Sequence, residues 1–252
     1  MTNCKNKCCE ESDLSRGVSG ESLDGSNSVH IWRICLDRDE SSAKRLLALL
    51  SKGERDRSSN YRFAADRNRF IVRRGMLRKI LAVYLRSEPR ALQFCSGECG
   101  KPYLTNLSRS LEFSVTHSQS IALIAVTRAG SVGVDLECVR PLSDLELMID
   151  SCLSDSEKSE LEVFPSASRL EYFYRYWTCK EAWLKSLGVG LDRPLTSVGI
   201  SLTASGTDHE AKLQISNEKR TDVVIRSFVP LDGYMAALAV PHSSMPYQQF
   251  SI

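Results

Sequence analysis

The chain has 252 residues, 42% of them hydrophobic and 25% charged, with a formal net charge of +2. It is long enough to bury a large core, as one domain or as two smaller ones. The near-neutral charge argues against a protein built for nucleic acid or membrane surfaces, and no apolar run approaches the ~18 residues of a membrane span. The N-terminal segment lacks the apolar centre of a secretion signal, so we expect a cytoplasmic protein with no membrane partner.

The nine cysteines are an odd number and are scattered along the chain. Without a secretion signal, this usage favours reduced thiols over a disulfide framework. Two groups of cysteines stand out, namely Cys4, Cys8 and Cys9, and Cys95 with Cys99. Neither group has the matching second pair or the well-spaced histidine of a zinc site, so we interpret them as structural or incidental thiols.

The first elements follow from composition and periodicity. Residues 1–28 are rich in serine, glycine and charge, and with so little apolar surface to bury we expect them to be disordered. The alternating apolar residues of 29–36 predict a strand, and residues 39–51 have the pattern of a helix. A longer helix is predicted over 60–85.

The predicted helix over 60–85 is rich in arginine. Its arginines are Arg62, Arg67, Arg69, Arg73, Arg74 and Arg78. Apolar residues recur between them at helical spacing, so we expect one face to be buried. The arginines could form a solvated basic face, or they could bind phosphate through their forked donors. No aromatic platform or known nucleic-acid motif accompanies them, so we expect no nucleic-acid partner.

The character of the chain changes after residue 110. Short apolar runs predict strands over 111–118, 121–127 and 132–139. Residues 128–131, Arg-Ala-Gly-Ser, indicate a hairpin turn between the last two strands. A helix is predicted to open at Ser154, whose side chain would cap it together with Glu157 three residues later.

Another helix is predicted over 168–187, with Gly188 as its natural stop. Further strands are predicted over 196–203, 211–215, 223–229 and 234–240. Because strands and helices follow one another without strict alternation, we expect an α+β fold with antiparallel sheets and not a doubly wound parallel sheet. The polar residues 242–252 are expected to form a loose tail.

Two acidic residues, Asp135 and Glu137, lie two positions apart in an apolar strand. Side chains at i and i+2 leave the same face of a strand, so the two carboxylates repel each other unless a cation lies between them. They could be a solvated pair on an amphipathic strand. They could instead hold a hard cation such as Mg²⁺, which takes a few carboxylates together with phosphate and water.

The helix over 168–187 places charges among aromatic residues. Trp177, Glu181 and Lys185 lie at i, i+4 and i+8 and therefore project along one side. Glu181 and Lys185 could form an exposed ion pair worth about 0.3 kcal/mol. If Glu181 instead met the two carboxylates of the strand, the group would form a metal–phosphate site in which Lys185 stabilises a leaving group or poises a nucleophile.

The motifs "GVDLE" (133–137) and "WTCKEAWLKSLG" (177–188) together resemble the paired signature of the 4′-phosphopantetheinyl transferases. The chain is similar to the long, single-chain, surfactin-type branch of that family. The segments "GKPYL" (100–104), "FSVTHS" (113–118) and the arginine-rich helix also resemble family segments, in the family's order. The resemblance covers about residues 29–240. The Trp and Ala of "WTCKEA" resemble the subgroup that includes cyanobacterial enzymes of glycolipid and polyketide synthesis.

The resemblance implies a pseudo-dimer of two similar α/β halves with antiparallel sheets and an active site in the cleft between them. The halves would span residues 29–131 and 132–241, with the metal site in the second half. Because both halves lie in one chain, we expect a monomer.

The resemblance also implies roles for the residues that match the family's motifs. Asp135, Glu137 and Glu181 would be the Mg²⁺ ligands. Asp135, Glu181 and Lys185 would form the catalytic group: Glu181 would take the proton from the attacking serine, and Lys185 would lie near the scissile pyrophosphate. Coenzyme A, the co-substrate, would be bound by Arg57, Arg69, Lys101, Pro102, Thr116, His117, Lys180 and Lys185.

Within that set, His117 would contact the 3′-phosphate of coenzyme A, and Lys180 would either line the cleft or lie at the surface. Two residues depart from the family's pattern. Thr116 stands where serine is usual, and its hydroxyl preserves the donor. Glu54 stands where some relatives have a basic residue, which puts in doubt the coenzyme A contacts upstream of Arg57.

The implied reaction is Mg²⁺-dependent transfer of 4′-phosphopantetheine from coenzyme A to a serine of an apo acyl carrier or peptidyl carrier protein. Attack by serine on the β-phosphate builds charge on the pyrophosphate, which a metal ion and a lysine can neutralise. The products would be holo-carrier and 3′,5′-ADP. The alternatives are a non-catalytic protein that binds carrier and coenzyme A, and an unrelated Mg²⁺-dependent phosphate enzyme.

Overall fold

The computed structural model describes residues 23, 27–97, 100–105, 111–188, 194–203, 209–214, 223–241 and 245–252. The N-terminal segment for which we expected disorder lies almost entirely outside these ranges, as do Cys4, Cys8, Cys9 and Cys99. Within the described ranges, none of the helices has the length and apolar character that crossing a membrane requires.

The first half runs from a strand through three helices to two hairpins. Its elements are β1 (Val29–Cys35), α2 (Glu40–Leu47), α3 (Lys52–Ser59), α4 (Ala64–Leu85), the 3₁₀ helix η1 (Pro89–Ala91), β2 (Phe94–Ser96), β3 (Pro102–Leu104), β4 (Glu112–Ser118) and β5 (Ile121–Thr127). The long predicted helix begins at Ala64, and α3 was not predicted. Its signal is a capping box, because Ser51 and Glu54 exchange hydrogen bonds at its start.

The second half repeats this order of elements. They are β6 (Gly133–Cys138), α5 (Leu145–Cys152), α6 (Asp155–Val163), α7 (Arg169–Leu187), the 3₁₀ helix η2 (Leu195–Ser197), β7 (Gly199–Thr203), β8 (His209–Gln214), β9 (Val224–Phe228) and β10 (Tyr234–Val240). The predicted capping box is confirmed, because Ser154 and Glu157 exchange hydrogen bonds at the start of α6. Gly188 ends α7 in the left-handed region at φ 71°, as predicted.

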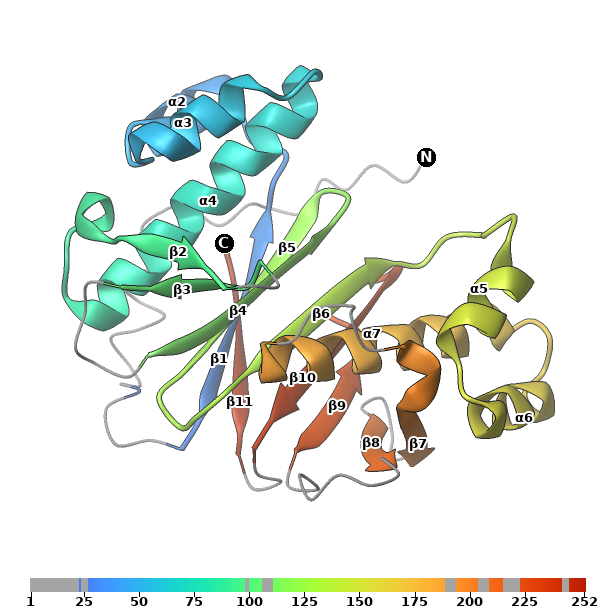
Figure 1. The fold of residues 1–252 in the computed structure, drawn as a ribbon. Coiled ribbons are helices and arrows are strands. Elements are labelled where there is room, and N and C mark those ends of the chain that lie inside the picture. The colour runs from blue at the N-terminus through green and yellow to red at the C-terminus, as the bar shows by residue number, and fades with distance from the viewer. Residues whose placement is uncertain are drawn as a thin grey trace.

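Both halves build an antiparallel sheet in the same strand order (Figure 1). In the first half β1 pairs with β5 and β5 with β4, and in the second half β6 pairs with β10 and β10 with β9. One long helix packs on each sheet, α4 in the first half and α7 in the second. The expected α+β class, with antiparallel sheets in two similar halves, is therefore confirmed.

The two sheets meet where β4 lies beside β6, and side chains join the two strands. Oγ of Ser114 accepts a hydrogen bond from the amide of Val134 at 3.1 Å, and Oγ of Ser118 accepts one from the amide of Cys138 at 3.0 Å. Residues 128–131 therefore connect one sheet to the other. The predicted hairpin turn is wrong, because β5 pairs with β4 and β1, whereas β6 pairs with β10.

Apolar side chains fill three clusters among the described residues. One lies under α4, one lies under α7, and the third joins the two sheets. The third cluster contains Ile31 and Leu123 from the first sheet and Leu136 and Leu238 from the second, none of them more than 1% exposed. The two halves therefore share a core, which holds the strands on either side of their junction in a fixed relation.

The last residues form a strand in place of the loose tail that we expected over 242–252. Strand β11 (Tyr247–Ser251) pairs in parallel with β1 and becomes an edge of the first sheet. The ring of Phe250 stacks on Trp32 with 4.6 Å between their centroids. The expected loose tail is therefore wrong for residues 247–251. Strand β11 adds one parallel pair to the otherwise antiparallel sheet.

Candidate active site

Charged side chains of β6 and α7 meet where these two elements adjoin β4 of the first half. We name Asp135, Glu137, Glu181 and Lys185 the cleft cluster. Nζ of Lys185 lies 2.6 Å from Oδ1 of Asp135. Thr116 of β4 donates a hydrogen bond to the same carboxylate oxygen at 3.0 Å. The structure thus brings together acidic and basic residues that are far apart in the sequence.

Gly133 allows α7 to approach β6 closely. A Cβ atom at this position would lie 1.9 Å from the carbonyl oxygen of Ala182 and 2.5 Å from the amide nitrogen of Ser186. Because both atoms belong to the helix backbone, no change of side-chain rotamer could relieve the overlap. The glycine that opens the "GVDLE" motif therefore places the acidic residues of β6 within reach of Lys185.

Burial and mutual repulsion raise the pKa of two carboxylates in the cleft cluster. The pKa of Glu181 is raised first by burial and then by Asp135, whereas Lys185 opposes the shift. The pKa of Glu137 is raised by burial and by Asp135, and a 2.9 Å hydrogen bond from Ser118 opposes it. A carboxylate whose pKa is raised toward neutrality is a stronger general base. Glu181 therefore has the chemistry of a proton acceptor.

The carboxylate of Asp135 suits a divalent cation whose remaining ligands come from water and the substrate. Asp135 is 3% exposed, and within the described part of the chain its Oδ2 has no hydrogen-bond partner. Among the residues that the structure describes, no three acidic, histidine or cysteine side chains already form a ligand set. Mg²⁺ usually takes one or two carboxylates and fills its shell with water and substrate phosphates, so the available carboxylate oxygen fits this ion.

An arginine-lined cavity lies in the first half, between α3, α4 and the β2–β3 hairpin. Its volume is about 750 Å³. Its charged lining residues are Glu54, Arg57, Arg73, Arg74, Arg78 and Arg90. Glu54 lies 2.5 Å from Arg74 and 2.7 Å from Arg78, so the arginines outnumber their carboxylate partner. A cavity with this excess of positive charge can bind phosphate groups.

His117 lies between the arginines of α4 and the cleft cluster. Nη1 of Arg73 lies 2.6 Å from Nδ1 of His117, which accepts its hydrogen bond. Although His117 is an exposed residue of β4, desolvation of its ring and the cations Arg73, Lys185 and Arg69 lower its pKa to about 4. The ring is therefore neutral at pH 7, and the surrounding cations make this corner of the cleft attractive to an anion.

Three of the predicted coenzyme A residues lie at the cavity or at the junction of the two halves. The guanidinium of Arg57 stands 5.5 Å from the centroid of the Phe70 ring at the wall of the cavity. Pro102 lines the same cavity. Nζ of Lys101 donates a 3.1 Å hydrogen bond to the carbonyl oxygen of Val132, at the junction of the two halves. These positions suit contacts with an extended ligand.

Two other predicted coenzyme A residues are engaged in ion pairs. Arg69 pairs with Asp37 at 2.6 Å, although it also borders a cavity of about 300 Å³ next to His117. Lys180 is fully buried, and its Nζ lies 2.6 Å from Oε2 of Glu157. The prediction that Lys180 lines the coenzyme A cleft or lies at the surface is therefore wrong. Adjacent residues on a helix point about 100° apart, and this one turns away from Glu181.

Sequence reasoning missed what Arg73 and Glu157 contact. The sequence indicates Arg73 only as part of an arginine-rich face, and its contact with His117 joins α4 to β4. Glu157 was recognised only as a helix cap, and its pairing with Lys180 joins α6 to α7. No local sequence pattern predicts either contact, because each joins residues from separate elements.

Comparison with known protein families matches both halves of the chain to one kind of enzyme. Residues 131–239 match the sequence model of the 4′-phosphopantetheinyl transferase superfamily, and residues 37–129 match that of the 4′-phosphopantetheinyl transferase N-terminal region. The two matched segments adjoin at the connection between the two sheets.

Individual relatives match over most of the chain. The 4′-phosphopantetheinyl transferase HetI of Nostoc sp. is 39% identical over 217 residues, which cover 85% of this chain and 88% of that protein. The 4′-phosphopantetheinyl transferase Sfp of Bacillus subtilis is 24% identical over 220 residues, which cover 86% of this chain and 95% of that protein. The solved holo-[acyl-carrier-protein] synthase of Thermotoga maritima has a TM-score of 0.34 at 22% identity, covering 44% of this chain and 62% of that one.

Proposed function

The chain belongs to the 4′-phosphopantetheinyl transferase superfamily, and we propose that its cleft transfers 4′-phosphopantetheine from coenzyme A to a serine of a carrier protein. The products are the holo-carrier and 3′,5′-ADP. The observation that best supports this assignment of the site is the pairing of Lys185 with buried Asp135 at 2.6 Å, on two closely packed elements of the second half.

Coenzyme A spans the two halves in this proposal. Its nucleotide end occupies the arginine-lined cavity, whose volume of about 750 Å³ is that of a small-molecule site. Its 3′-phosphate lies at the corner formed by Arg73 and His117, where cations attract the anion. Its pyrophosphate extends past Lys101 and Thr116 toward the cleft cluster.

Mg²⁺ would be held by Asp135, Glu137 and Glu181. The Oδ2 atom of Asp135 is buried and lacks a hydrogen-bond partner in the described part of the chain, so it is available as a ligand. When bound, Mg²⁺ would neutralise the negative charge that develops on the pyrophosphate.

In the proposed reaction Glu181 accepts a proton, and Lys185 stabilises the charge on the leaving group. Glu181 takes the proton of the serine hydroxyl as the serine oxygen bonds to the β-phosphorus of coenzyme A. The bond from that phosphorus to the oxygen shared with the α-phosphate breaks, and its electron pair leaves with 3′,5′-ADP. The ammonium group of Lys185 stabilises the charge on this leaving group.

The partner and setting are also part of the proposal. The carrier is an acyl or peptidyl carrier protein, because the reaction needs an exposed serine on a small acceptor domain. One chain supplies both sides of the cleft, which supports a monomer. We place the protein in the cytoplasm, where its co-substrate coenzyme A is available.

The decisive experiment is intact mass spectrometry of an apo carrier protein incubated with this protein, coenzyme A and Mg²⁺. Parallel samples contain a chelator or the Glu181→Gln variant. We expect the carrier to gain the mass of one phosphopantetheine group, and we expect both parallel samples to lose that gain. If several carriers gain no mass while coenzyme A still binds, the protein is a non-catalytic binder and the proposed activity is wrong.

A further inference from the structure

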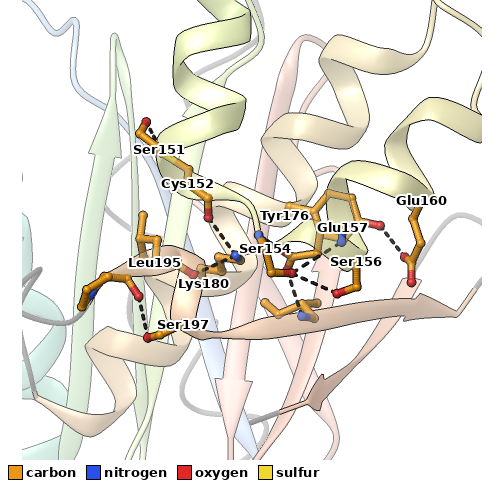
Figure 2. Close-up of polar contacts among 12 residues, drawn as sticks. Ser151, Cys152, Ser154, Ser156, Glu157, Glu160, Tyr176, Lys180, Leu195 and Ser197 are labelled. Atoms are coloured by element: carbon orange, nitrogen blue, oxygen red, sulfur yellow. Dashed lines mark hydrogen bonds and ion pairs between the residues drawn. The ribbon is translucent and has the colours of Figure 1, made fainter. Parts of the chain in front are cut away.

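A buried ion pair joins α7 to α6 (Figure 2). The side chains of Lys180 and Glu157 are both 0% exposed, and their charged atoms are 2.6 Å apart. Neither side chain belongs to the cleft cluster. Two charges in an apolar interior are costly unless both are fully paired, so this pair needs an explanation beyond simple packing.

The ammonium group of Lys180 has acceptors in three different segments. Besides Glu157 of α6, it donates to the carbonyl oxygen of Cys152 at the end of α5, at 2.8 Å. It also donates to the carbonyl oxygen of Leu195 in η2, at 2.9 Å. An ammonium group has three donors, so all of them are used. Lys180 therefore ties α7 to α5, α6 and η2.

The carboxylate of Glu157 is satisfied by the same kind of network. Its Oε2 also accepts a hydrogen bond from the amide of Ser154 at 2.7 Å, and its Oε1 accepts one from the amide of Ile200 in β7 at 2.8 Å. The carboxylate is thus held from the start of α6 and from the second sheet. It cannot move toward or away from α7 without breaking backbone contacts.

The network holds α7 at Lys180, the residue next to Glu181. Lys180 and Glu181 are consecutive, so their side chains leave the helix about 100° apart. A rotation of α7 by about 20° would move an atom about 5.5 Å from the helix axis by about 2 Å. A displacement of about 1 Å at a reacting group can reduce a rate by about 100-fold. A change in the anchoring of Lys180 that rotated α7 would therefore displace Glu181.

We propose that the Glu157–Lys180 pair is a positioning device that sets the rotation of α7, so that Glu181 and Lys185 face Asp135. The pair contacts neither substrate nor metal and acts through the helix. This inference rests on the proposed transferase function. Because replacing a buried ion pair by neutral groups of similar volume often leaves stability nearly unchanged, positioning can be measured separately from folding.

The test compares two network variants with a matched surface variant. The double variant Glu157→Gln/Lys180→Met removes both charges at similar volume. The variant Glu157→Asp keeps the charge but retracts the carboxylate by one methylene group, which provides a milder change if the double variant unfolds. The control Lys158→Met removes a lysine from the same helix as Glu157, where it pairs with the exposed Asp150 at 3.2 Å.

Carrier loading gives kcat and the KM for coenzyme A, and urea unfolding gives the folded fraction of each variant. For the two network variants we expect kcat to fall about 10- to 100-fold, with the KM for coenzyme A within about twofold of wild type, because the first half binds the nucleotide. The control should match wild type. A folded network variant whose kcat stays within about twofold of wild type would overturn the positioning role. A wild-type protein that loads no carrier would overturn the transferase function instead.

Discussion

The long helices α4 and α7 occupy corresponding places in the two halves, yet their charged residues face different surroundings. On α4, Arg73 and Arg74 border an open cavity whose carboxylate is Glu54. On α7, Lys185 faces the buried Asp135 of β6 at 2.6 Å. Asp135 raises the pKa of Glu181 and Lys185 lowers it. The two halves thus share a strand order but differ in the charged side chains that their long helices carry. The first suits phosphate binding and the second suits bond making and breaking.

The halves also differ in which atoms lie close to a glycine at a packed helix. A Cβ atom at Gly75 of α4 would lie 2.7 Å from the side-chain Cβ of Leu46 on α2, whereas one at Gly133 would lie 1.9 Å from the backbone oxygen of Ala182 on α7. Either overlap would force a helix to move, and at Gly133 that movement would displace the cleft cluster. The close approach at Gly133 therefore lies in the half to which we assign the chemistry, where a small change of distance has a large effect on rate.

Removing the charge of Lys185 should produce the largest effect. We expect Lys185→Met to lower kcat by about 10²- to 10³-fold, because the departing 3′,5′-ADP loses the cation that stabilises it. Intact mass spectrometry of the carrier measures the rate. Lys44→Met, which breaks an exposed ion pair with Glu40 on α2, should leave kcat at the wild-type value. Equal losses in both variants would contradict the separation of roles between the halves.

The two glycines test whether close packing matters equally in both halves. We expect Gly133→Ala to lower the free energy of unfolding by about 1–3 kcal/mol and to lower kcat as well, because α7 must move away from β6. Gly75→Ala should lower the free energy of unfolding while kcat stays within about twofold of wild type. Urea unfolding and carrier loading measure the two quantities. A kcat loss in Gly75→Ala as large as that in Gly133→Ala would show that the first half controls the chemistry too.

A smaller effect is expected from Arg73, which should act on binding alone. Arg73→Met should raise the KM for coenzyme A about 10-fold with little change in kcat, because the 3′-phosphate loses a charged hydrogen bond. The KM for 3′-dephospho-coenzyme A should be almost unchanged by the same substitution. Arg67→Met, on the exposed side of α4, is the matched control. If both substrates were affected equally, the 3′-phosphate would lie elsewhere.

The smallest effect concerns the pH dependence of stability in the metal-free protein. Burial and Asp135 raise the pKa of Glu181 above its value in the unfolded chain, so the folded state binds the proton more tightly. The resulting stabilisation is present below the unfolded pKa and is lost as the pH rises through the folded pKa. Wild type should therefore lose free energy of unfolding relative to Glu181→Gln across that interval. A difference that does not vary with pH would mean that Glu181 is not the titrating group.

Local signals predicted much of the fold correctly. The capping box of Ser154 and Glu157 opens α6, and Gly188 closes α7. These signals work because a cap satisfies backbone groups within one turn of itself. The same kind of signal at Ser51 does not by itself predict α3, because this helix has almost no apolar face.

Contacts between distant segments could not be predicted in this way. Residues 128–131 have the composition of a hairpin turn, but their flanking strands pair with other partners. The polar residues of β11 gave no strand signal, and their pairing with β1 depends on where the second half ends in space. Strand pairing is decided by which edges are left open, and a single segment does not contain that information.

The sequence by itself determined the family, the α+β class, and the residue types of the cleft cluster, because motif spacing and side-chain chemistry are local properties. Only the tertiary structure decided that Lys180 turns to Glu157 and its neighbour Glu181 to the cleft, and that Arg73 meets His117. A helix pattern states the angle between two side chains, but which of them faces the core depends on the segments that pack around the helix.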